Sequence, residues 1–471
     1  MPSMLAFIML LGWPVIAAWL FFSQRFEKAI IWSVVFPFLF MPSSFAIDLP
    51  GLPALDRISV PNVTLLAFVM LLPNHSLKLI PRSNLAKICI LLVLLGPFFT
   101  VYYNGDSYFA GPRPIRGTEP FDAISWATES FFLLIPFLVA RSFLTQVDQQ
   151  REILMAMLWA GLVYSLLILI EVRLSPQLHI KIYGFFPHSF LQQIRDGGFR
   201  PVVFLRHGLW VAFFTMSVAI SAAIIWRATD VKRRQLYGVA AAYMTVVLVL
   251  CKSLASLIYC LFLLPVVMLL SPKNQVRVAA LLVAMSLAYP MLRGADLFPV
   301  GPILSVARAI DVDRADSLQD RFDNEDILLD RAKLRPVFGW GGWGRSRVYN
   351  IRGKDVSVTD GRWIVLFGTY GWVGFIGFFG LLAIPVFALL RLTSDPAIAA
   401  NLSPITSGLS LLVAINMVEF LPNSTLPMMT MLIGGALLGH CEKLRAEGPA
   451  KAPEPAGKTA TDRPRKPRTV L

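Results

Sequence analysis

The sequence predicts an all-α, polytopic membrane protein, and three observations support this fold class. First, hydrophobic residues make up 56% of the 471 residues and charged residues only 15%, which lies outside the range of soluble globular domains. Second, the mean hydropathy is +0.63, and the apolar residues fall in runs of roughly 17 to 25, the length that a helix needs to cross a bilayer. Third, Lys and Arg cluster in alternate connections between these runs, as the positive-inside rule requires.

About 12 to 13 transmembrane helices are expected within residues 1–440, because each apolar run is close to the length of one span. The runs lie near residues 4–22, 29–47, 59–73, 85–102, 122–140, 153–171, 204–226, 236–251, 254–271, 277–293, 362–390, 404–421 and 424–440.

The cations predict which connections face the cytoplasm. The cation-rich connections lie near 25–28, 78–82, 141–151, 227–234, 273–277 and 391, and we expect them to be cytoplasmic. The three longest connections, 103–121, 172–203 and 294–361, would then be periplasmic loops. Most of the net charge of +14 follows from this topology, so no nucleic-acid partner is expected.

The C-terminal residues 441–471 are rich in Pro, Ala and charge and lack hydrophobic periodicity. A segment of this composition cannot bury a core, so it is predicted to be a disordered, basic cytoplasmic tail. Its cations could contact anionic membrane lipid.

The loop 294–361 contains a predicted helix and a glycine-rich turn. The helix is expected to begin at Ser317, to include an Arg321–Glu325 pair at i,i+4 spacing, and to end at Pro336. The turn "PVFGWGGWG" follows, with Gly339 and Gly341 among the glycines that permit backbone conformations closed to other residues.

Two tryptophans in this turn have two possible roles. Trp340 and Trp343 either anchor the turn at the membrane interface or offer flat faces to a sugar ring.

The loop 172–203 and the residues after it gather cations on the side where the positive-inside rule disfavours them. Arg200, Arg206 and His207 lie in "RPVVFLRHG". An arginine presents a planar fork of donors that matches phosphate oxygens, so the cluster predicts a site for an amphiphilic anion. For any single cation, the alternative is that its side chain extends to lipid head groups.

Several short motifs follow one another at defined spacings between residues 195 and 380. Arg321 precedes Pro336 by fifteen residues, and Gly371 and Gly374 open the next predicted span, eleven and more residues after Asp360. The approach "GGFRPVVFLRHGLW" and the polar motif "CKSLASL" come earlier in the chain. Together these motifs resemble the O-antigen ligase and polymerase superfamily of membrane glycosyltransferases. The family often has a histidine where this chain has Asp360.

The resemblance implies a GT-C-like membrane fold, metal-independent glycosyl transfer without a cofactor, and a polyprenyl-diphosphate-linked glycan as the donor. The active site would face the periplasm from the bacterial inner membrane. Arg321, with Arg200 or Arg206, would hold the diphosphate charge, and Asp360 would take the proton of the acceptor hydroxyl. Alternatively, Asp360 is a helix cap.

Four functions are compatible with the sequence. Polymerisation of the repeat units of an exopolysaccharide or O-antigen is preferred, because Asp360 replaces the histidine. The alternatives are ligation of the glycan to a lipid A core or other acceptor, a flippase or exporter of lipid-linked glycan, and a non-catalytic scaffold. Expected partners are the lipid-linked glycan, membrane lipid, and a chain-length regulator or export machinery.

Overall fold

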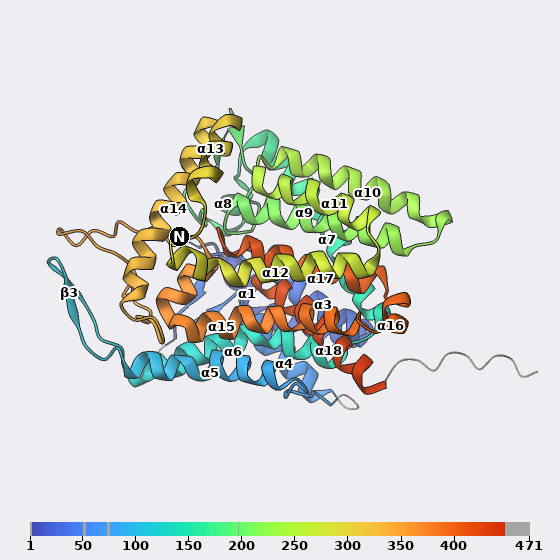
Figure 1. Cartoon of the computed structure of the whole chain (residues 1–471), viewed down its shortest axis with the longest axis horizontal. Coiled ribbons are helices and arrows are strands. Elements are labelled where there is room, and N and C mark those ends of the chain that lie inside the picture. Colours follow the sequence, from blue (N-terminus) through green and yellow to red (C-terminus); the bar gives the residue numbers. More distant parts are fainter. Residues whose placement is uncertain (1, 50–52, 73–75, 196, 448–471) are drawn as a thin grey trace, which may run out of the picture.

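The computed structural model describes residues 2–49, 53–72, 76–195 and 197–447, and in these residues the protein is a helical bundle (Figure 1). The bundle consists of helices that mostly run along one direction in Figure 1. They are α1 (Met4–Leu11), α2 (Trp13–Ser23), α3 (Phe26–Phe40), α4 (Ser59–Leu71), α5 (Asn84–Tyr102), α6 (Pro120–Phe143), α7 (Val147–Leu174), α9 (Gly208–Ala228), α10 (Val231–Leu250), α11 (Leu254–Leu269), α12 (Pro272–Gly294), α15 (Arg362–Leu392), α17 (Pro404–Glu419) and α18 (Pro427–Glu447).

Six of the described helices are long and apolar enough to cross a membrane, which supports a multi-pass membrane protein. They are α5, α6, α7, α9, α12 and α15. A seventh span results if α1 and α2, which meet at an angle of 42° at Gly12, count as one. This number is smaller than the twelve to thirteen predicted, because several apolar runs, such as those of α4, α11 and α17, form helices of only 13 to 16 residues.

Burial distinguishes a central helix from the peripheral ones. In α9, 89% of the most apolar stretch is buried, against 33% in α5. The exposed side of α5 carries Leu85, Ile88, Leu91 and Leu95, which recur every three or four residues and so share one face. A continuous apolar face of this kind is stable against lipid hydrocarbon and unfavourable in water.

The two predicted classes of connection lie at opposite ends of the bundle. At one end, which we call the tail end, Arg141 forms a buried ion pair with Glu442 at 2.8 Å, and Lys28 lies 3.5 Å from Glu152. The three long connections lie at the other end, the loop end, on the left in Figure 1. The charge pattern of the sequence therefore corresponds to a physical division of the molecule.

Short elements form the loop end. They are β1 (Ala46–Ile47), β2 (Leu55–Asp56), β3 (Tyr108–Ala110), β4 (Arg113–Ile115), α8 (Leu178–Tyr183), the 3-10 helix η1 (Leu191–Gln193), β5 (Ile194–Arg195), β6 (Gly198–Phe199), α13 (Val300–Ile310) and α14 (Val312–Lys333). The strands form three antiparallel two-stranded hairpins, β1–β2, β3–β4 and β5–β6. The short helix α16 (Pro396–Ala400) lies at the tail end.

Two helix boundaries and one hairpin differ from what the sequence predicts. The helix α14 begins at Val312 and not at Ser317, so the preceding acidic stretch is helical. The helix α18 continues to Glu447, past residue 441 where the tail was expected to begin, and the rest of the tail lies outside the described residues. The loop 103–121 contains the β3–β4 hairpin, which the hydropathy pattern does not indicate.

Candidate functional site

A pocket of about 830 Å³ opens at the loop end of the bundle. This volume lies in the range of roughly 300–1,000 Å³ that is typical of ligand sites. Four segments far apart in the sequence form most of its wall: residues 188–210, residues 317–325 of α14, residues 358–364, and residues 418–424 between α17 and α18. Tyr259, Tyr289, Phe298 and Ile303 complete the lining. Arg200, Arg206, His207, Arg321 and Asp360, all predicted as site residues, lie on its wall.

Two of the arginines in this pocket have no carboxylate partner among the described residues. Arg206 is exposed and forms no hydrogen bond or ion pair with a described residue. Arg321 donates from Nη1 to two neutral oxygens, Pro422 O at 3.1 Å and Asn423 Oδ1 at 3.3 Å. The ion pair with Glu325 that the i,i+4 spacing predicts is therefore not the interaction that Arg321 makes.

A relay of hydrogen bonds fixes Arg321. Glu419, at the end of α17, is 2% exposed, and its Oε1 accepts from Asn423 Nδ2 at 2.9 Å. The same amide presents its oxygen to Arg321, so Glu419 sets the orientation of Asn423 and thereby the position of the guanidinium. Sequence reasoning missed both residues, although an isolated acid at the end of an apolar run is a signal for a polar function.

The arginine-bearing segment 200–206 is held by buried groups on three sides. The backbone N–H of Arg200 donates to Gln193 O at 2.7 Å, and its Nε donates to Lys252 O at 3.1 Å. Lys252 belongs to the "CKSLASL" motif and bonds from Nζ to Arg195 O at 2.9 Å. The Glu171 carboxylate, 1% exposed, accepts from the backbone N–H groups of Val202 and Val203, both at 2.7 Å.

His207 caps α9 and faces the pocket as a neutral ring. Its Nδ1 accepts from the backbone N–H of Leu209 at 3.1 Å. Burial, followed by the charges of His188 and of the pocket arginines, lowers the pKa of His207 to about 3. Because Nδ1 is an acceptor, we assign the proton of the neutral ring to Nε2, so His207 can donate a hydrogen bond to a ligand.

Three carboxylates line the pocket, those of Asp320, Glu325 and Asp360, and the last two differ in their surroundings. Glu325 is buried and bonds to Tyr289 Oη at 2.6 Å and Trp363 Nε1 at 3.1 Å, and Arg293 lies 3.5 Å away. Burial raises the pKa of Glu325 despite these partners. Asp360 is exposed, and its carboxylate forms no hydrogen bond with a described residue.

Asp360 does not cap α15. The N-cap residue is Gly361, and no side chain caps the helix. The first N–H groups of α15 donate instead to backbone oxygens of the α17–α18 turn, from Arg362 to Asn423 O at 3.0 Å and from Trp363 to Phe420 O at 3.3 Å. The helix-cap alternative for Asp360 is therefore wrong, and its carboxylate is available to a ligand.

The glycine-rich turn and the "G-x-x-G" of the following helix interlock. Gly371 breaks α15 with φ 64°, and a Cβ atom there would lie 2.4 Å from the Val337 carbonyl carbon. The break allows Trp372 N–H to donate to Pro336 O at 2.8 Å. Gly339 (φ 68°) packs as closely against Thr369, which accepts from the N–H of Gly341 at 2.8 Å.

Gly374, the second glycine of the "G-x-x-G", is buried. A Cβ atom at this position would lie 2.4 Å from the Cβ atom of Tyr370, so the glycine permits close packing. These glycines thus support the pocket wall and do not line it.

The two tryptophans of the turn lie outside the pocket. Trp340 is 8% exposed, donates from Nε1 to Arg331 O at 2.8 Å, and stacks with the Arg331 guanidinium, 3.4 Å from its ring centroid. Trp343 is 57% exposed and donates to Asp122 Oδ1 at 3.0 Å, with Arg116 over its ring. Trp340 therefore has a packing role, and Trp343 is an exposed ring beside Arg116 that does not line the pocket.

Comparison with protein-family models and with curated proteins finds no match to this chain.

Proposed function

We propose that this protein is a membrane glycosyltransferase that polymerises polyprenyl-diphosphate-linked repeat units of a surface polysaccharide at the periplasmic face of the bacterial inner membrane. One observation carries the proposal: three segments far apart in the sequence bring Arg200, Arg206, Arg321, His207 and Asp360 to one pocket.

The charge of the pocket suits a diphosphate. Neither Arg206 nor Arg321 forms an ion pair or a hydrogen bond with a carboxylate of the described residues, and His207 offers a neutral donor. A diphosphate brings several negative oxygens, and preorganised guanidinium groups stabilise such charge most strongly where water is partly excluded. In this function, the arginines stabilise the charge that develops on the leaving diphosphate.

The transfer step requires a base as well as cations. The bond between the anomeric carbon of the donor glycan and the diphosphate oxygen breaks, and the electron pair leaves with the diphosphate. The acceptor hydroxyl oxygen forms the new bond to that carbon, and its proton passes to Asp360, whose carboxylate is exposed and unbonded within the described chain.

The position of the pocket favours transfer over transport. A flippase should hold its polar groups along a path through the spans. Here the pocket arginines lie at the loop end, in residues 200–206 and in α14. Ligation to a lipid A core or other acceptor uses the same donor chemistry, and the product distinguishes it from polymerisation.

The test uses the purified full-length protein in nanodiscs with lipid-linked repeat units extracted from the source membranes. We expect longer lipid-linked glycans without any added acceptor. Replacing Arg321 with Lys should lower the rate at least about 10²-fold, since a point charge cannot reproduce the planar fork.

Arg352→Lys provides the matched control, because Arg352 is exposed and lies outside the pocket. Glycan transfer only after addition of a lipid A core would favour the ligase. Movement of the lipid-linked unit between leaflets without a new bond would exclude both transferases, and full activity of Arg321→Lys would exclude this site.

A further inference from the structure

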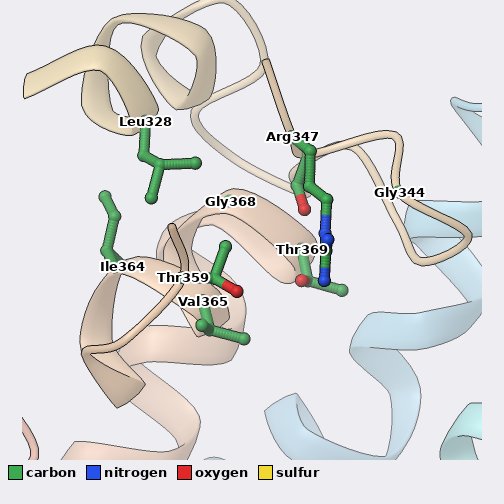
Figure 2. Close-up of a pocket in the computed structure, with 9 residues that line it drawn as sticks. Leu328, Gly344, Arg347, Thr359, Ile364, Val365, Gly368 and Thr369 are labelled. Carbon is green, nitrogen blue, oxygen red and sulfur yellow. The ribbon is translucent and has the colours of Figure 1, made fainter. Parts of the chain in front are cut away.

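A second, smaller cavity of about 170 Å³ lies beside the pocket (Figure 2). Thr359 and Ile364 line both cavities, so the segment that carries Asp360 separates the two. Its other walls come from α14, from the chain after the glycine-rich turn, and from the first part of α15.

Hydroxyl groups line this cavity. Ser346, Thr359 and Thr369 all line it and are half-buried, and in the described part of the chain none of their hydroxyls has a hydrogen-bond partner. These three hydroxyls are therefore available to hydrogen-bond a polar ligand in the cavity.

The remaining walls define the chemistry of that ligand. Arg347 lies on one side, and Leu328 and Ile364 lie on the other (Figure 2). Arg347 pairs from Nη1 with Asp355 at 2.7 Å, outside the cavity lining, which balances its charge. A balanced cation, several hydroxyls and an apolar wall match a neutral sugar ring, which has hydroxyls at its edge and C–H groups on its face.

The size limits what can bind. A volume of about 170 Å³ is well below the roughly 300–1,000 Å³ of sites for larger ligands, so the cavity suits a single sugar residue.

We propose that the small cavity binds the terminal sugar residue of the acceptor glycan, while the arginine pocket binds the donor diphosphate. This inference rests on the proposed function and assigns the acceptor subsite within it. The acceptor sugar would enter from the side of Ser346 and Thr369, and its reacting hydroxyl would meet the donor across the segment that carries Asp360.

The experiment separates the two sites by measuring two quantities for the full-length protein. The first is the affinity for undecaprenyl diphosphate, which carries no sugar and probes the arginine pocket alone. The second is the KM of chain extension with the native lipid-linked repeat unit. The double variant Ser346→Ala/Thr369→Val removes two hydroxyls and keeps the backbone contacts of the turn.

For this double variant we expect the KM of extension to rise about tenfold, since two hydrogen bonds of modest strength are lost, with the affinity for undecaprenyl diphosphate unchanged. Ser346→Leu, which fills the cavity, should abolish extension and also leave that affinity unchanged. Arg321→Ala should show the opposite pattern, with weaker binding of undecaprenyl diphosphate.

Two results would overturn the acceptor assignment: normal extension by both cavity variants, or a loss of undecaprenyl diphosphate affinity in the double variant as large as that in Arg321→Ala. A wild-type protein that binds no undecaprenyl diphosphate and extends no glycan would instead overturn the proposed function itself.

Discussion

Replacement of Glu171 with Gln should destabilise the protein and weaken the arginine pocket together. Glu171 lies in the last turn of α7 and is 1% exposed. Its Oε1 accepts from the N–H of Leu178 at 2.9 Å, and its Oε2 accepts from the N–H groups of Val202 and Val203, both at 2.7 Å. One carboxylate therefore fixes both ends of the segment that carries Arg200.

The expected loss follows from these three bonds. A glutamine keeps one acceptor oxygen and turns an NH₂ group toward at least one backbone donor. Hydrogen bonds to a charged acceptor contribute about 1.5–3 kcal/mol each, and neutral ones about 0.5–1.5 kcal/mol. Losing one charged bond and weakening two gives a loss of about 3–5 kcal/mol in the free energy of unfolding.

The assay is thermal unfolding of the purified protein in detergent, combined with the affinity for undecaprenyl diphosphate. Glu152→Gln is the matched control, because Glu152 lies in the same helix and forms one half-exposed ion pair with Lys28 at 3.5 Å. Such a pair contributes roughly 0–1 kcal/mol. If Glu171→Gln unfolds at the same temperature as Glu152→Gln, the role of Glu171 as the anchor of this segment is refuted.

Three further variants test the site and its support. In His207, the folded pKa of about 3 lies below the usual value of 6.5, so the unfolded state binds the proton first on acidification, and stability falls from about pH 6.5 toward pH 3. Between pH 7 and pH 5, thermal unfolding should show a loss of about 1–2 kcal/mol in the free energy of unfolding. The variant His207→Asn, which keeps a capping oxygen, should show a smaller loss, and an equal loss in both proteins contradicts this role of His207. Asp360→Asn should slow glycan transfer by about 10²–10⁴-fold, measured as initial rates, without weakening undecaprenyl diphosphate binding, and an unchanged rate rules out Asp360 as the base. Arg345 is 0% exposed and donates to three backbone oxygens, so Arg345→Met should cost about 3–5 kcal/mol in urea unfolding, whereas Lys333→Ala, at an exposed ion pair, should cost less than about 1 kcal/mol; equal costs exclude this role for Arg345.

The sequence predicts the fold class and the separation of the two ends because both depend on bulk properties. Hydropathy identifies the helices, and cation placement identifies which connections lie together. The number of spans is predicted less well, since a run such as 254–271 shortens to a 16-residue helix that ends before Pro272. Composition cannot show where a helix bends or stops short of the bilayer thickness.

The sequence predicts the cations of the pocket but not the residues that hold them in place. Arg200, Arg206 and Arg321 attract attention because they lie where the positive-inside rule disfavours cations. Their anchors are not visible in the same way. Asn423 contacts Arg321 from 102 positions along the chain, a pairing that no local spacing encodes.

For the tryptophans, the sequence predicts a contact that the structure does not leave available. Trp340 has the residue type of a sugar platform, but its indole N–H and its ring face are already bound to Arg331. Residue type therefore suggests a contact, and only the neighbours decide whether the contact is available.

The hydrogen bonding of the buried acids explains how the pocket remains cationic. Glu419 bonds to the Asn423 amide, and Glu171 bonds to three backbone N–H groups. Neither carboxylate forms an ion pair with Arg206 or Arg321 within the described residues, although buried Glu419 lies close enough for the charge of Arg321 to act on it. A carboxylate paired directly with either arginine would stabilise the empty protein, but it would compete with any anionic ligand. The acids thus hold the arginine-bearing segments in place without occupying the guanidinium groups that we propose bind the diphosphate.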